Sequence, residues 1–183
     1  MERKEIRISG FGGQGVIMAG SIVGKAAALF GGKNATLTQS YGPESRGGSC
    51  AAEVIIADEQ IDYPYVTEPQ VQIILSQDAY YKYGRNAPYG MLVIVDGELV
   101  KVHPGVDPQP LRVSASRLAQ EMGRPVVANI IALGFLAAVS DIVSVEALKK
   151  SILDSIPPGT EEMNMKAFEL GYKHGIEQKE KTR

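Results

Sequence analysis

The hydrophobic and polar positions of this chain alternate between the period of a β-strand and the period of an α-helix. Residues 5–9 follow the two-residue alternation of a half-buried strand, and residues 16–30 place apolar side chains near helical spacing. Further strands are predicted at residues 34–39, 50–57, 71–76, 91–96 and 99–102, with a short helix at 78–83. Beyond Arg112 the pattern is helical, at residues 115–122, 129–139, 145–156 and 161–172.

Strands that alternate with helices in this way predict an α/β fold. We expect a three-layer, Rossmann-like arrangement, with a mostly parallel sheet and helices on both faces. The 183 residues suffice for one buried core and are few for two, so residues 1–183 are predicted to form a single domain. Prolines at 157 and 158 predict a break before the last helix, and the charged residues 176–183 are predicted to form a solvated tail.

Charge and hydropathy exclude two classes of partner. The net charge is −2, so the chain lacks the basic footprint that is typical of nucleic-acid binding. The longest apolar run, residues 130–139, is about half of what a bilayer span needs, and the N-terminal "MERKEIRI" enters a strand instead of a signal peptide. We therefore expect a cytoplasmic protein that binds neither nucleic acid nor membrane.

The cysteine count restricts the chemistry further. With Cys50 alone, the chain cannot form an internal disulfide, a thiolate zinc site or an iron–sulfur cluster of its own. His103 and His174 are the only histidines, and neither stands at helical spacing to a second ligand, so we expect no internal metal site. Cys50 lies between small residues at a strand entrance, which favours buried packing over the alternative of a nucleophile.

The first glycine cluster, "GFGGQG", fits the pattern G-x-G-x-x-G and joins a predicted strand to a predicted helix. The residues that could contact a phosphate there are Gly10, Gly12, Gly13, Gln14 and Gly15. Glycines allow a tight turn, and the helix N-terminus offers unpaired N–H groups with a partial positive charge. The alternative is that the glycines only let the helix pack closely on the strand.

A complete dinucleotide site is disfavoured. Such a site needs an acidic residue at the end of the second strand, where it holds a ribose hydroxyl. Here that strand ends in Thr38, Gln39 and Ser40, and the nearest acid, Glu44, follows Pro43.

The second glycine cluster, "QSYGPESRGG", follows the second strand, so it is expected at the same carboxyl edge of the sheet as the first. Two such loops at one edge predict one shared binding site or interface. Arg46 could make a forked contact to a phosphate or carboxylate, or could pair with Glu44. The candidate binding residues are Gln39, Tyr41, Gly42, Pro43, Glu44, Arg46, Gly47 and Gly48. Since neither a Ser/His/Asp arrangement nor a P-loop is present, we predict no catalytic residue in this chain, which binds and positions.

Four ordered motifs resemble one known family over residues 6–172. "GFGGQGVIMAG", "QSYGPESRGGSCAAEVIIADEQIDYP", "VVANIIALG" and "EMNMKAFELGY" resemble the gamma subunit of the 2-oxoacid:ferredoxin oxidoreductases. In that family a multisubunit enzyme decarboxylates a 2-oxoacid on thiamine diphosphate, passes electrons through iron–sulfur clusters to ferredoxin, and transfers the acyl group to coenzyme A. The short form with "YGPESRGG" and "IDYPYV" most resembles the 2-oxoglutarate branch, with the pyruvate, branched-chain and indolepyruvate branches as alternatives.

The resemblance implies a set of partners. Thiamine diphosphate, Mg and the clusters belong to other chains, so this chain would join alpha and beta catalytic subunits, a ferredoxin-like delta subunit and, through the complex, ferredoxin. The two glycine loops would then meet either the phosphate-bearing part of coenzyme A or a partner subunit. A stand-alone nucleotide- or CoA-binding module is the alternative function.

Aromatic residues supply a candidate partner surface, because aromatic side chains are enriched in interface cores. The candidates are Tyr63, Tyr65, Tyr80, Tyr81, Tyr83 and Tyr89. The alternative is that half of these tyrosines pack internally.

Overall fold

The computed structural model describes residues 3–42, 48–85, 87–106 and 109–181. Its strands are β1 (Arg3–Phe11), β2 (Asn34–Tyr41), β3 (Ser49–Ala57), β4 (Val71–Ile74), β5 (Leu92–Asp96) and β6 (Leu111–Val113). The helices are α1 (Val16–Lys25), α2 (Gln77–Ala79), α3 (Ala115–Glu121), α4 (Ala128–Val139), α5 (Val145–Ser155) and α6 (Glu161–Lys181). Further helical segments are η1 (Ala26–Phe30) after α1, η2 (Tyr80–Gly84) after α2 and η3 (Pro125–Val127) before α4.

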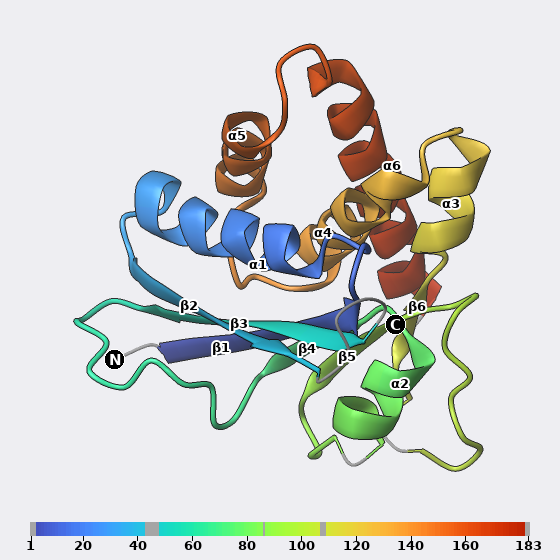
Figure 1. Ribbon diagram of the computed structural model, residues 1–183, viewed down its shortest axis with the longest axis horizontal. Coiled ribbons are helices and arrows are strands. Elements are labelled where there is room, and N and C mark those ends of the chain that lie inside the picture. Colours follow the sequence, from blue (N-terminus) through green and yellow to red (C-terminus); the bar gives the residue numbers. More distant parts are fainter. Residues whose placement is uncertain (1–2, 43–47, 86, 107–108, 182–183) are drawn as a thin grey trace.

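The six strands form one sheet in the order β2-β3-β1-β4-β5-β6 (Figure 1). The strand β3 pairs antiparallel with both β1 and β2, whereas β1, β4, β5 and β6 are joined by parallel ladders. Within this sheet β3 alone runs against the other strands, so the predicted mostly parallel α/β sheet is confirmed.

One predicted strand is wrong. Residues 99–102 form no strand; the last strand is β6, at Leu111–Val113. The reason is a turn centred on Asp96, whose Oδ1 accepts from the amides of Glu98 at 3.0 Å and Leu99 at 3.1 Å. The Val100 amide then donates to the Asp96 carbonyl at 2.9 Å, so these residues use their hydrogen bonds locally.

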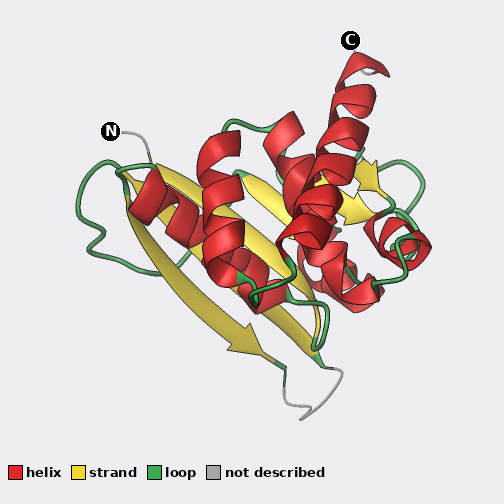
Figure 2. Ribbon diagram, turned by 90° about the horizontal axis from the view of Figure 1, so that it is seen from above, coloured by secondary structure: helices red, strands yellow, loops and turns green. Residues whose placement is uncertain are grey.

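Most helices cover one face of the sheet. Figures 1 and 2 show α1, α4, α5 and α6 lying over the strands on the same side, and Figure 1 shows α2 on the opposite side. The main core lies beneath the larger layer, and a smaller core packs Ile74, Val93 and Val95 against Tyr80 beside α2. Helices on both faces of the sheet make the three predicted layers.

The helix α4 is apolar nearly all round because neighbours surround it. Its residues from Asn129 to Ala138 are buried. The helix α6 packs against it so closely that a Cβ at Gly171 would stand 1.9 Å from the Ile131 carbonyl oxygen. No helix in the described ranges combines the length and the apolarity that a membrane span requires.

The final helix is longer than the sequence predicts. It continues past Tyr172 to Lys181, so most of the predicted tail belongs to α6. Its last residues, Lys179, Glu180 and Lys181, are exposed to solvent. The helical spacing of apolar residues ends before the helix does, which is why the pattern underestimates its length.

Candidate functional site

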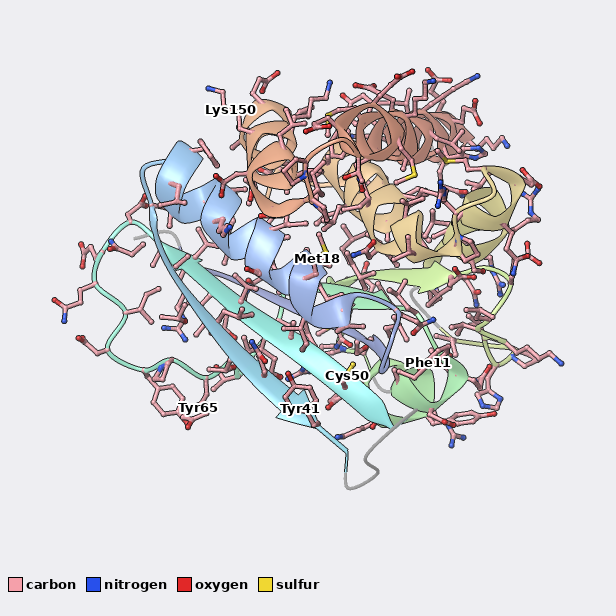
Figure 3. The ribbon with its side chains drawn as sticks, turned by 45° about the horizontal axis from the view of Figure 1, so that its top comes forward. Phe11, Met18, Tyr41, Cys50, Tyr65 and Lys150 are labelled. Atoms are coloured by element: carbon pink, nitrogen blue, oxygen red, sulfur yellow. The ribbon has the colours of Figure 1, made fainter. Side chains whose placement is uncertain are left out.

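The two glycine-rich turns meet at one edge of the sheet. Because β3 runs antiparallel between β1 and β2, the carboxyl ends of β1 and β2 lie together. The Gly12 amide donates to the Gly48 carbonyl at 3.1 Å, and the Gly42 amide donates to the Ser49 carbonyl at 2.7 Å. Figure 3 shows Phe11, Tyr41 and Cys50 at this same edge. The shared edge predicted from sequence is confirmed, and we call it the glycine edge (residues 10–15, 39–42 and 48).

Gln14 holds the first turn together. Its Oε1 accepts from the Phe11 amide at 2.9 Å, and its Nε2 donates to the Leu75 carbonyl at 2.7 Å, just beyond β4. Both ends of the carboxamide are therefore used within the chain. Gln14 thus braces the turn, and the contact to a ligand that the sequence suggests for it stays a prediction.

Glycine occupies the positions of this turn for two different physical reasons. Gly15 has φ 71°, and a Cβ there would stand 2.4 Å from Nδ2 of Asn129. A Cβ at Gly10 would stand 2.4 Å from Oε1 of Gln14. Gly13, with φ 103°, has open space where its Cβ would be. Close packing thus explains why positions 10 and 15 are glycine. At Gly13 the space beside the backbone is open.

The N-terminus of α1 points its unpaired donors toward this turn. Its N-cap is Gly15, which has no side chain to accept from them, and no acidic residue lies in the first turn. The first intrahelical bond runs from the Ala19 amide to the Gly15 carbonyl at 2.9 Å. In the part of the chain that the structure describes, the amides of Val16, Ile17 and Met18 have no acceptor. This end of the helix is electrostatically suited to an anion.

The second loop is described in part. Tyr41 is 69% exposed, and its hydroxyl donates to Oε1 of Gln39 at 2.6 Å. The predicted site residues Pro43, Glu44, Arg46 and Gly47 lie outside the described residues.

Sequence reasoning missed Asn129, which links α4 to the first turn. Asn129 is buried, and its Nδ2 donates to the Gly15 carbonyl at 3.2 Å while its Oδ1 accepts from the Ile130 amide at 2.9 Å. The signal was a single polar residue at the head of an otherwise apolar helix. The predicted packing role of Cys50 is confirmed: the residue is buried in the main core, and burial raises the pKa of its thiol.

The tyrosines of the candidate partner surface differ in exposure, and their role in an interface stays a prediction. Tyr63, Tyr65, Tyr81 and Tyr89 are exposed, Tyr83 is half-buried, and Tyr80 is fully buried. Tyr80 lies in the small core because the helical turn after α2 directs it toward β4 and β5. The rings of Tyr63 and Tyr65 contact each other edge to face, with centroids 5.4 Å apart.

Comparison with known proteins identifies the family. The family described as pyruvate ferredoxin/flavodoxin oxidoreductase matches residues 5–174. The chain belongs to this family. It is 51% identical to the 2-oxoglutarate synthase subunit KorC of Methanocaldococcus jannaschii, over 93% of this chain and 92% of that protein. To the pyruvate synthase subunit PorC of the same organism it is 33% identical, over 92% of this chain and 94% of that one.

A solved structure agrees with the fold over nearly the whole chain. The keto/oxoacid ferredoxin oxidoreductase gamma subunit of Geobacter sulfurreducens superposes with a TM-score of 0.85 at 37% identity. The match covers 97% of this chain and 99% of that chain. The resemblance seen in the four sequence motifs is confirmed, together with the α/β fold that it implies.

Proposed function

We propose that this chain is the accessory gamma-type subunit of a 2-oxoglutarate:ferredoxin oxidoreductase. That enzyme oxidatively decarboxylates its 2-oxoacid to an acyl-CoA and CO2 and reduces ferredoxin. The observation that carries the proposal is the full-length match to a 2-oxoglutarate synthase subunit, which is much stronger than the match to the pyruvate synthase subunit of the same organism.

The chemistry of electron transfer is assigned to other chains. Iron–sulfur clusters need several thiolate ligands, and this chain has one cysteine, which is buried. Thiamine diphosphate, Mg and the clusters would therefore be held by alpha, beta and ferredoxin-like delta subunits. The role of this chain is to bind and position, and its cytoplasmic location stays a prediction.

The glycine edge is our candidate contact to coenzyme A. The open space at Gly13 and the unpaired amides at the start of α1 fit a phosphate group. The Gly12 amide is already bonded to Gly48, and Gln14 is occupied as a brace, so neither is assigned to the ligand. Coenzyme A supplies the thiol that accepts the acyl group, and this chain would hold its phosphates. The alternative for the second loop is contact with a partner subunit.

Reconstitution tests the proposed function. The chain is co-expressed with its candidate catalytic subunits, purified as a complex and assayed on a panel of 2-oxoacids with CoA and a viologen dye. We expect the complex to prefer 2-oxoglutarate and the isolated chain to be colourless and inactive. Turnover by the isolated chain, or failure of the subunits to associate, would overturn the proposal.

Arg46 tests the coenzyme A contact separately. A charge-assisted contact contributes about 1.5–3 kcal/mol, so Arg46→Ala should raise the apparent CoA requirement about 10- to 150-fold. Arg46→Lys should recover part of the loss, because an ammonium cannot make a forked contact. If Arg46 instead braces a subunit interface, both variants lower every activity together and loosen the complex on size exclusion. Unchanged CoA dependence in an intact complex refutes the contact.

A further inference from the structure

A groove opens on the face of the sheet opposite the main helical layer. Figure 1 shows α2 on this face. It has a cavity volume of about 660 Å³ and lies between the loop 67–70 and residues 81–85 and 88–91. Arg7 and Gln72, on adjacent strands β1 and β4, belong to its lining. We call it the Arg7 groove and define it by Arg7, Gln72, Lys82, Tyr83, Arg85 and Tyr89.

Its cations are arranged on tyrosine rings. The Arg7 guanidinium and the Lys82 ammonium lie over the Tyr83 ring, at 4.8 and 4.9 Å from its centroid, and Arg85 lies 5.6 Å from the Tyr81 centroid. Such contacts restrict long side chains before any partner arrives, which lowers the entropy lost on binding. The groove is thus preorganised for a negatively charged partner.

The charge of the groove is only partly neutralised within the chain. Arg7 pairs with Glu53, with Nε to Oε1 at 2.6 Å and both side chains less than one-fifth exposed. Lys82 and Arg85 have no carboxylate partner among the described residues, and both are exposed. Glu68 is the one acidic residue among the described residues that line the groove. Two cations therefore remain for an incoming acidic group.

One buried polar atom that borders the groove, Oε1 of Gln72, has no hydrogen-bond donor among the described residues. Gln72 is 2% exposed, its Nε2 donates to the sulfur of Met91 at 3.0 Å, and its Oε1 accepts from no described donor. A sulfur atom is a weak acceptor, so the carboxamide can rotate when a better partner is offered. An unsatisfied amide at this depth is costly in an isolated domain.

The composition and the place of the groove favour a protein over a small ligand. Small ligands of open α/β sheets bind at the carboxyl ends of the strands, whereas this groove lies at the amino ends of β4 and β5. Its lining includes three tyrosines and two arginines, and both residue types are enriched at protein interfaces. Tyr89, at 91% exposure, has almost none of its ring covered by this chain.

We propose that the Arg7 groove is the docking site for an acidic segment of a catalytic partner subunit. Its Asp or Glu side chains pair with Lys82 and Arg85, and Tyr89 is buried against the segment. This inference rests on the proposed function, because it takes the partner from the same oxidoreductase.

The test measures the affinity of the purified chain for the catalytic subunits by biolayer interferometry. The double variant Lys82→Glu/Arg85→Glu is compared with Lys150→Glu/Lys173→Glu, which makes the same change in charge at exposed lysines of α5 and α6. Figure 3 shows Lys150 on the helical layer, away from the sheet. We expect the groove variant to lose at least about 30-fold in affinity and the control to stay within about 2-fold. Raising salt from about 50 to about 300 mM should weaken wild type more than the groove variant.

Three further measurements identify the segment that occupies the Arg7 groove and exclude misfolding as the cause of weaker binding. Tyr89→Ala keeps all charges and should also weaken binding, which a general electrostatic effect would not produce. A zero-length carbodiimide cross-linker should couple Lys82 to an Asp or Glu of the partner. Circular dichroism melts check that every variant is folded.

The outcomes separate this inference from the proposed function. If wild type and the groove variant bind the catalytic subunits equally and assemble active enzyme, the docking site is wrong and the proposed function stands. If wild type binds no catalytic subunit, both are overturned. If the isolated chain binds ATP or inorganic phosphate through Lys82 and Arg85, measured by calorimetry, the groove is a small-ligand site and the inference is overturned.

Discussion

Glu5 is the residue whose substitution is expected to test the fold most directly. Its carboxylate is buried on β1, and its Oε2 accepts from the amides of Thr67 at 2.7 Å and Glu68 at 2.8 Å. Its Oε1 accepts from Nε of Arg3 at 2.8 Å. The carboxylate thus fastens the loop before β4 to the sheet, and this loop forms one wall of the Arg7 groove.

The substitution Glu5→Gln keeps the size of the side chain and removes its charge. If the remaining oxygen stays with the two amides, the new NH2 group faces the Arg3 guanidinium, so one acceptor is lost and the other bonds lose their charge assistance. Hydrogen bonds to charged groups contribute about 1.5–3 kcal/mol, and we expect a loss of that order. For a chain of this length it corresponds to a fall of about 3–12 °C in Tm.

The stability lost in Glu5→Gln should depend on pH in a defined direction. Burial raises the pKa of Glu5, but hydrogen bonds from the amides of Glu68 and Thr67 and from Arg3 outweigh it, so the folded pKa is lowered. A lowered folded pKa means that the carboxylate stabilises the fold above its unfolded pKa and that this stability disappears as pH falls through the folded value. The difference in unfolding free energy between wild type and Glu5→Gln should therefore reach its maximum at neutral pH. It should shrink below about pH 4.5.

Thermal melts followed by circular dichroism between pH 3 and pH 8 measure both effects. The matched control is Glu59→Gln, which removes the same charge from an exposed residue and should stay within about 0.5 kcal/mol of wild type. A Glu5→Gln variant as stable as the control at neutral pH, or a difference that grows in acid, would refute this account of the loop.

Two further predictions concern packing. Gly171→Ala should lower the free energy of unfolding by more than about 3 kcal/mol or prevent folding, because its Cβ would collide with the Ile131 carbonyl oxygen. At Gly24 the nearest neighbour of an added Cβ lies at 3.8 Å, so Gly24→Ala should raise the free energy of unfolding by up to about 1 kcal/mol through helix propensity. Urea unfolding of both variants checks this contrast, and equal effects would contradict it. Tyr80→Phe should stabilise the protein by about 0.5–1 kcal/mol, because the buried Tyr80 hydroxyl has no partner among the described residues; a clear loss in the same assay would show that this hydroxyl is bonded.

Local pattern was sufficient for most of the elements. The helical spacing in residues 16–30 and 145–156 and the alternation in residues 5–9 come from which side chains must avoid water, and the structure has helices and a strand there. The glycine pattern and the strand order along the chain also placed two turns at one sheet edge. The helices and the strand depend on residues close by in sequence. The position of the two turns depends on the rule that the carboxyl ends of parallel strands lie at one edge of a sheet.

Tertiary structure decided which side chains meet. The reversed strand β3, between β1 and β2, brings Gly12 to Gly48, and the sequence around it does not record its direction. Glu5 and Tyr80 are the kinds of residue that commonly face solvent at least in part, yet both are buried because the loop before β4 and the small core close over them. A residue's period in sequence gives its face on an element, but what covers that face is set by segments far away in the chain, through packing and hydrogen bonds that form only when the sheet is complete.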